Sequence, residues 1–135
     1  MVVNNALLLR TFQIGSTRHR DEGLRIAVTR RPPRGVPKSE WGSHGRFDVW
    51  FPVLAPSQVL LRRTKKANLE DARTRAAFFA AYEKELNRPE ARHIVGLIAA
   101  IARHTPIAVG CYCDDERRCH RSVLKRVIEE SRTSL

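Results

Sequence analysis

The fold depends on one stretch, residues 106–113, which read Pro-Ile-Ala-Val-Gly-Cys-Tyr-Cys. This unbroken run of apolar and small side chains is typical of a parallel strand buried on both faces of a sheet. Helical patterns precede it, from Asn68 to about Asn87 and again from Pro89, and another helix follows it, beginning at Cys119 or His120. The alternation of helix, strand and helix predicts an α/β fold. We expect a single small domain with a partly parallel sheet flanked by helices.

The first half of the chain carries strand and loop signals. Residues 6–14 and 24–29 have the apolar, partly β-branched character of two strands. Residues 30–37 are predicted to form a loop, because two consecutive prolines remove backbone donors there and a glycine follows. A short strand is predicted at 47–51 and a turn at 55–57.

Apolar side chains at helical spacing predict which faces of the later helices are buried. The first helix is predicted to end just before Pro89, and the second to begin there, because proline suits the first turn of a helix. The predicted inward-facing residues are Ala72, Phe78, Phe79, Tyr82 and Leu86, then Ile94, Leu97, Ile98 and Ile101, and finally Val123, Leu124, Val127 and Ile128.

Size and composition exclude several classes of protein. With 135 residues, 42% hydrophobic and 29% charged, the chain suits one globular domain and not a wholly disordered segment. No apolar run reaches the roughly 18 residues of a membrane span. The N-terminus lacks the pattern of a signal peptide, so we expect a cytoplasmic protein. Three cysteines are too few for a disulfide framework.

The formal net charge is +11, and most of it lies in residues 1–67, which hold 13 basic and 4 acidic side chains. Twenty of the 25 basic residues are arginine, whose planar fork suits phosphate and carboxylate groups. This excess favours a polyanionic partner, nucleic acid or nucleotide. Two alternatives stay open: an arginine-rich genome composition without functional meaning, and an acidic protein partner. No cofactor is predicted, and the oligomeric state is left open.

Reactive side chains are concentrated between Cys111 and Arg121. The segment follows the buried strand and leads into a helix, which is the position where open α/β sheets bind ligands. The free N–H groups of the helix start favour an anion, and Arg121 adds positive charge. Because Cys119 begins that helix beside His120 and Arg121, its pKa is predicted to be lowered.

Three functional interpretations of this segment compete. In the first, an anionic phosphate or carboxylate binds to Arg121, His120 and the helix end. In the second, the nucleophile is Cys119 or Cys113, with His120 as base or acid. In the third, zinc is bound by the cysteines and His120, although their spacing does not favour a zinc site. The segment lacks the phosphatase loop, which needs an arginine six residues after its cysteine. A structural alternative also stays open, with Cys111 and Cys113 as buried apolar groups, His120 bonded to a carbonyl, and Arg121 paired with an acid of residues 114–116.

A second candidate region is the loop that holds Arg30, Arg34 and Gly35. If the strand before it runs parallel to the strand at 106–111, both loops lie at one edge of the sheet. The guanidinium groups would then face the segment 111–121 across a cleft. A solvated basic loop is the alternative.

At these residues the chain resembles a family of small bacterial proteins, domain-of-unknown-function family 488. Its C-terminal signature, a strand-end cysteine eight residues before a Cys-His-Arg triplet, is matched by Cys111 and by residues 119–121. Many relatives carry glutamate where this chain has Cys113. Further matches are Arg30, Pro33, Arg34, Gly35, Asp48, Trp50, residues 55–57, Phe78, Tyr82, Glu85 and Leu86. The resemblance spans about residues 11–130 and implies a compact α/β domain, without supplying a reaction.

The preferred function from sequence is binding of a phosphate-bearing ligand, a nucleotide or nucleic acid, in a cleft between the two loops. Arg30, Arg34, Gly35, Arg121, Cys111 and Cys113 are the predicted ligand-binding residues, and Cys119 and His120 the catalytic ones if chemistry occurs. The alternatives are a thiol-dependent or zinc-binding enzyme that uses the same cluster, and a non-catalytic partner-binding domain.

Overall fold

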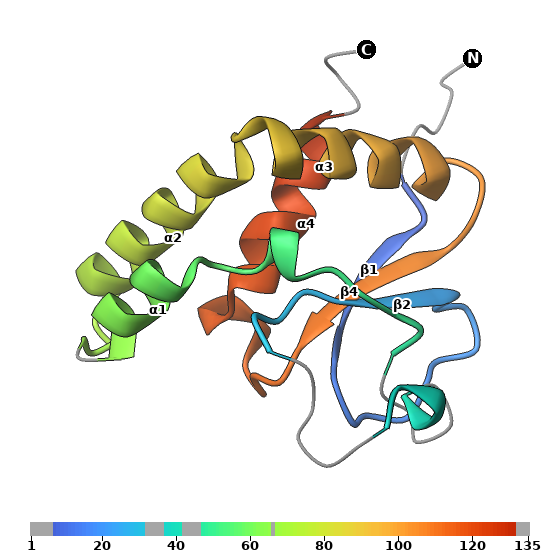
Figure 1. The fold of residues 1–135 in the computed structure, drawn as a ribbon, viewed down its shortest axis with the longest axis horizontal. Coiled ribbons are helices and arrows are strands. Elements are labelled where there is room, and N and C mark those ends of the chain that lie inside the picture. The colour runs from blue at the N-terminus through green and yellow to red at the C-terminus, as the bar shows by residue number, and fades with distance from the viewer. Residues whose placement is uncertain (1–6, 32–36, 42–46, 66, 132–135) are drawn as a thin grey trace.

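The computed structural model describes residues 7–31, 37–41, 47–65 and 67–131 (Figure 1). Three strands come first along the described chain, three α-helices follow, and a fourth strand and a fourth α-helix end it. The strands are β1 (Leu9–Gln13), β2 (Leu24–Ala27), β3 (Val49–Trp50) and β4 (Ile107–Cys111). The helices are α1 (Gln58–Lys65), α2 (Ala72–Leu86), α3 (Pro89–Ala102) and α4 (His120–Ser131). None of the described helices is long and apolar enough to cross a membrane.

The four described strands form one sheet in the order β1-β4-β2-β3, and every neighbouring pair is parallel. β4 lies between β1 and β2, and all five of its residues are buried. This confirms the predicted α/β fold and the predicted buried strand. The end of β2 lies beside the end of β4, where Ala27 is paired with Gly110.

Side chains of β4 alternate between the two faces of the sheet. Ile107 and Val109 lie in the main core with residues of α3 and α4, and Cys111 continues this alternation on the same face. The opposite face carries a smaller cluster with Phe12 and Ala108. There the Phe12 ring lies directly over Gly110, where an added Cβ would come within 2.5 Å of the ring. Cys111 therefore points toward the helices.

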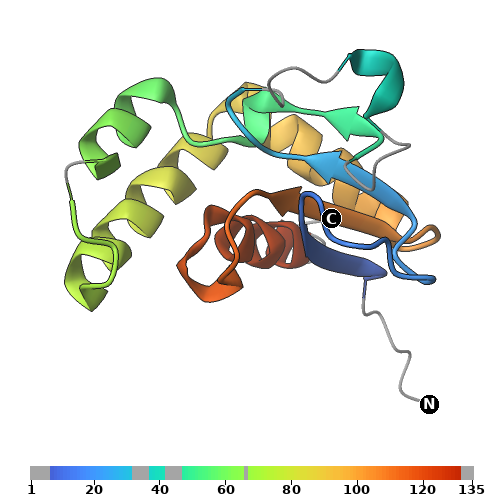
Figure 2. The same ribbon diagram turned by 90° about the horizontal axis from the view of Figure 1, so that it is seen from below.

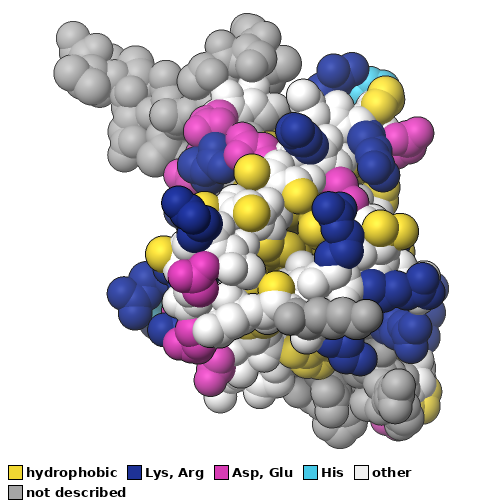
Figure 3. All heavy atoms as spheres, turned by 90° about the vertical axis from the view of Figure 1, so that its left-hand side faces the viewer, with side chains coloured by type: hydrophobic (Ala, Val, Ile, Leu, Met, Phe, Trp, Pro, Cys, Tyr) yellow, Lys and Arg dark blue, Asp and Glu magenta, His cyan; other side chains and the backbone are white. Residues whose placement is uncertain are grey.

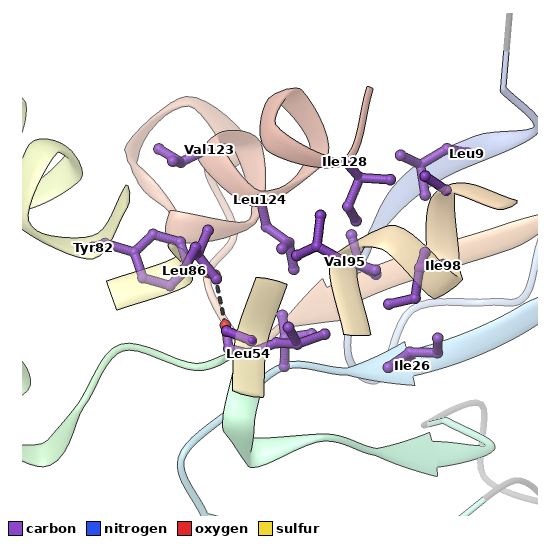
Figure 4. Packing of buried hydrophobic residues seen from close by; sticks show 14 of the residues in the cluster. Leu9, Ile26, Leu54, Tyr82, Leu86, Val95, Ile98, Val123, Leu124 and Ile128 are labelled. Carbon is purple, nitrogen blue, oxygen red and sulfur yellow. Dashed lines mark hydrogen bonds between the residues drawn. The ribbon is translucent and has the colours of Figure 1, made fainter. Parts of the chain in front are cut away.

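The main core joins the sheet to α2, α3 and α4 (Figure 4). Leu86, Val95 and Leu124 come from these three helices and are nearly inaccessible to solvent. α1 and α2 extend to one side of the sheet in both ribbon views (Figures 1 and 2). The Tyr82 hydroxyl of α2 donates a 2.6 Å hydrogen bond to the carbonyl of Leu54, which fastens α2 to the segment after β3.

Two helical predictions were wrong in part. α1 was missed, because no element was predicted between the turn at residues 55–57 and the helix from Asn68. In α3 the predicted inward residues Leu97 and Ile101 are 54% and 40% exposed. The buried residues of α3 are instead Ala91, Val95, Ile98, Ala99 and Ala102.

The start of α2 also differs from the prediction. Asp71, and not Asn68, is the N-cap, and its carboxylate accepts the backbone N–H of Thr74 at 2.9 Å. Asn68 caps the turn before the helix, where its side chain accepts the N–H of Glu70. The predicted end near Asn87 and the predicted start of α3 at Pro89 are confirmed.

Candidate functional site

The candidate site lies where β4 ends and α4 begins. β4 ends at Cys111, a loop with a short 3-10 helix (Glu116–Arg118) follows, and α4 starts at His120. The junction predicted from the sequence is therefore present. It brings Cys111, Cys113, Cys119, His120 and Arg121 into one cluster, which is called the thiol cluster below.

Two thiols form the centre of the thiol cluster. The Sγ atoms of Cys111 and Cys119 lie 2.9 Å apart, and both residues are buried, at 4% and 1% exposure. Cys111 reaches this position as the last residue of β4 on the helix-covered face. Cys119 reaches it as the residue immediately before α4. At this separation the two sulfur atoms are in hydrogen-bond contact and can share a proton.

The third thiol, that of Cys113, is exposed to solvent. Its backbone N–H donates to the Cys111 Sγ at 3.3 Å. Hydrogen bonds from the Cys113 and Cys119 side chains lower the pKa of Cys111, and the positive charge of Arg121 acts in the same direction. Hydrogen bonding to Cys111 and Cys113, together with burial, raises the pKa of Cys119.

The prediction that the pKa of Cys119 is lowered was therefore wrong. The physical reason is the partner thiol, which the helix-start argument did not include. The backbone N–H of Cys113 and the neighbouring thiols lower the pKa of Cys111, while the same thiol contacts raise that of Cys119, so the pair favours the negative charge on Cys111. The cysteine whose pKa is lowered is therefore the one at the strand end and not the one at the helix start.

His120 has a defined hydrogen-bonding state. Its Nε2 lies 2.8 Å from the carbonyl oxygen of Val28, and because a carbonyl only accepts, Nε2 carries the proton. Nδ1 is then unprotonated and lies 3.8 Å from the Cys119 Sγ. Burial lowers the pKa of His120, which keeps the ring neutral. The Tyr82 ring packs edge-on against the imidazole at a centroid distance of 5.3 Å.

Arg121 is a buried cation at 4% exposure. Its Nη1 donates to the backbone carbonyl of Cys113 at 2.6 Å, which holds the loop against α4. Its Nε is buried without a hydrogen-bond partner among the described residues. Within the described part of the chain, no ion pair joins Arg121 to the acids of residues 114–116, and Asp115 pairs with Arg117 and Arg118 instead.

The predicted arginine loop is only partly described. Arg30 is half-buried, and its Nε and Nη2 donate to the backbone carbonyls of Pro56 and Ala55 at 3.2 and 3.1 Å. With Arg88 and other residues it lines a cavity of about 200 Å³. Arg34 and Gly35 lie outside the described residues. The contacts of Arg30 thus hold the segment after β3, and none of them reaches the thiol cluster.

Three groups of the cluster are also possible metal ligands. The ligand atoms of Cys111, Cys119 and His120 lie within 4.8 Å of one another. In a tetrahedral zinc site with Zn–S bonds of about 2.3 Å, two sulfurs lie about 3.8 Å apart. The 2.9 Å between Cys111 and Cys119 is shorter, so zinc would require the pair to separate.

Sequence reasoning missed one contributor to the site and left another unidentified. Tyr82 was assigned only to the core, although it also holds the His120 ring. The alternative interpretation had His120 bonded to a carbonyl, and the structure identifies that carbonyl as the one of Val28, the residue after β2. A backbone carbonyl leaves no side-chain signal in a sequence, whereas Tyr82 was among the residues matching the family pattern.

Comparison with known families gives one match. A family model described as DUF488-N3a, "Active DUF488-N3 subclade", matches residues 9–132. No curated protein and no solved structure matches the chain significantly. The match covers every described strand and helix nearly in full, including the whole thiol cluster.

Proposed function

The chain belongs to the DUF488 family, and we propose that it is a cysteine-dependent enzyme whose nucleophile is the thiolate of Cys111. The observation that carries the proposal is the 2.9 Å contact between the Cys111 and Cys119 sulfurs at the carboxyl end of a buried parallel strand. Thiolates are the reactive form of cysteine, and they are stabilised by hydrogen-bond donors and nearby cations.

Each member of the thiol cluster has a role in this proposal. Cys111 attacks an electrophilic centre of the substrate. Cys119 donates a hydrogen bond to the resting thiolate of Cys111. The unprotonated Nδ1 of His120 lies on the other side of Cys119 and accepts its proton when the Cys119 thiol ionises. Arg121 supplies a buried positive charge, which favours a substrate that is anionic or becomes so during the reaction.

The pH dependence of Cys111 alkylation tests the proposal. In a Cys113→Ser variant, which removes the exposed thiol and keeps a hydroxyl donor, the rate with iodoacetamide should stay nearly constant from pH 8 down to pH 5.5. The reason is that a lowered pKa keeps Cys111 ionised over this range, whereas an ordinary thiol with a pKa near 8.5 loses about tenfold in reactivity per pH unit. Peptide mapping by mass spectrometry assigns the alkylated residue.

Burial of Cys111 slows its alkylation at every pH, so the shape of the profile is the relevant measurement. A Cys111→Ser, Cys113→Ser double variant serves as the control and should leave only the slow reaction of Cys119. A profile that falls tenfold per unit below pH 8.5 would contradict an activated Cys111.

A second candidate function, binding of a phosphate-bearing ligand such as nucleic acid, is favoured by a basic groove on the helical side of the molecule. The groove lies between α1 and α2, has a volume of about 800 Å³ and includes Leu60 and Ala81 among its apolar lining. Arg63, Lys84 and Arg88 also line it. An apolar hollow on this face is bordered by Lys and Arg side chains, with Asp and Glu side chains among them (Figure 3). With a net charge of +11, this surface suits a polyanion.

Binding of a fluorescent single-stranded oligonucleotide at increasing salt tests this candidate. A variant in which Arg63, Lys84 and Arg88 are all alanine should bind more weakly, and the slope of log K against log salt should fall by about two, since each lost phosphate contact removes about 0.7. The matched control replaces three exposed arginines elsewhere, Arg20, Arg103 and Arg117. Equal losses in both variants would contradict a role for the groove.

A further inference from the structure

We infer that the thiol cluster is a disulfide relay, in which the exposed Cys113 thiol exchanges with a low-molecular-weight disulfide and passes the oxidation to the buried pair Cys111 and Cys119. This rests on the proposed function, because it uses the same ionised Cys111. It goes further by naming the substrate class, a small disulfide of the glutathione type, and the residue that first meets it.

The first observation is the distribution of exposure among the three thiols. Cys113 is open to solvent, while Cys111 and Cys119 are 4% and 1% exposed. A disulfide in solution therefore meets Cys113 first. The backbone N–H of Cys113 in turn donates to the Cys111 Sγ at 3.3 Å. Oxidation received at Cys113 thus has a contact path to the buried pair.

The second observation is the position of the buried pair. A disulfide bond joins sulfurs about 2.05 Å apart, so the Cys111 and Cys119 sulfurs at 2.9 Å need to approach by less than an ångström. A base is also present, since the unprotonated Nδ1 of His120 lies 3.8 Å from the Cys119 Sγ. Cys119 can give up its proton there at the moment it becomes a nucleophile.

The relay consists of three thiol–disulfide exchanges. The Cys113 thiol attacks a sulfur of the small disulfide and its proton passes to the departing sulfur, so that a mixed disulfide forms and one small thiol leaves. The Cys111 thiolate then attacks the Cys113 sulfur and displaces the second small thiol as its thiolate, which takes a proton from water and leaves a Cys111–Cys113 disulfide. Finally Cys119, deprotonated by His120, attacks the Cys111 sulfur and frees Cys113, which takes up the proton. Overall two protein thiols are oxidised and one disulfide is reduced to two thiols.

The test uses the whole chain and oxidised glutathione as the probe. After timed incubation at pH 7, free thiols are blocked with N-ethylmaleimide and the peptides are mapped by mass spectrometry. We expect a Cys111–Cys119 disulfide and two molecules of reduced glutathione released per chain. Cys113→Ser should slow disulfide formation at least tenfold, and Cys119→Ser should halt the reaction at the Cys111–Cys113 disulfide.

Two results would overturn the relay. One is a Cys113–glutathione mixed disulfide that persists in the wild-type chain. The other is one zinc ion per chain in protein purified without chelator, with all three cysteines protected from glutathione. The first result leaves the proposed function intact if Cys111 is still alkylated at pH 5.5. Loss of that low-pH alkylation in metal-free protein overturns the proposed function itself, so the two failures are distinguishable.

Discussion

Replacing Glu22 by glutamine should lower the free energy of unfolding by about 3–5 kcal/mol, because it leaves a buried guanidinium without its counter-charge. The side chains of Glu22 and Arg25 are only 4% and 1% exposed, and their bidentate pair has contacts of 2.7 and 3.1 Å. Arg25 also donates to the Ser16 carbonyl and lies 4.4 Å from the Phe12 ring centre. These contacts hold the charge in place when its partner is removed.

Urea denaturation of the wild-type chain and of Glu22→Gln measures this effect. The matched control is Glu83→Gln, which breaks an ion pair with Arg126 whose side chains are 46% and 47% exposed and should change stability by at most about 1 kcal/mol. A double variant with Glu22→Leu and Arg25→Met should lose less than Glu22→Gln alone, since no charge is then left buried. Equal small effects for Glu22→Gln and Glu83→Gln would show that Arg25 does not depend on Glu22.

Replacing Cys119 by alanine should reduce the alkylation rate of Cys111 at pH 5.5 by at least about 100-fold, measured in the Cys113→Ser background. The Cys119 thiol is one of the two side-chain hydrogen-bond donors that lower the pKa of Cys111. Without it the pKa of Cys111 should rise toward that of an ordinary thiol near 8.5, which is only about one part in a thousand ionised at pH 5.5.

Cys119→Ser is the control for this experiment, because serine keeps a hydroxyl donor in nearly the same place. It should retain most of the low-pH rate. Thermal unfolding of both variants shows whether the fold persists. Similar rates for the alanine and serine variants would mean that the donor at residue 119 does not stabilise the thiolate, and that the charge on Arg121 and the backbone N–H of Cys113 suffice.

The predictions that succeeded rest on local sequence signals. β4 was recognisable because its residues are apolar or small without interruption, and the junctions of α2 and α3 because Asn87 and Pro89 end and begin helices. α1 lacked such a signal, since it has eight residues and only Leu60 of its three apolar side chains is buried. In α3 most positions are apolar, so the pattern did not distinguish the buried face, and the small Ala99 and Ala102 face the core in place of Leu97.

The site was predicted in its position and only partly in its chemistry. The sequence places Cys111, Cys119, His120 and Arg121 at one strand–helix junction, and the structure brings them together there. The relative pKa values of the two thiols depend on the 2.9 Å contact between Cys111 and Cys119, which are eight residues apart in the chain. An argument based only on the helix start does not include this contact. The contacts of Arg30 with carbonyls of residues 55 and 56 are equally non-local.

The order of strands in the sheet has a consequence for biosynthesis. β1 has β4 as its sole neighbour in the described sheet, although nearly 100 residues separate the two strands in the chain. During synthesis, the backbone hydrogen-bonding groups of β1 and of one edge of β2 therefore have no strand partner until residues 107–111 have left the ribosome. Such open edges invite pairing with other chains, and bringing distant segments together slows folding. A nascent chain of this topology is at greatest risk of aggregation shortly before its synthesis is complete.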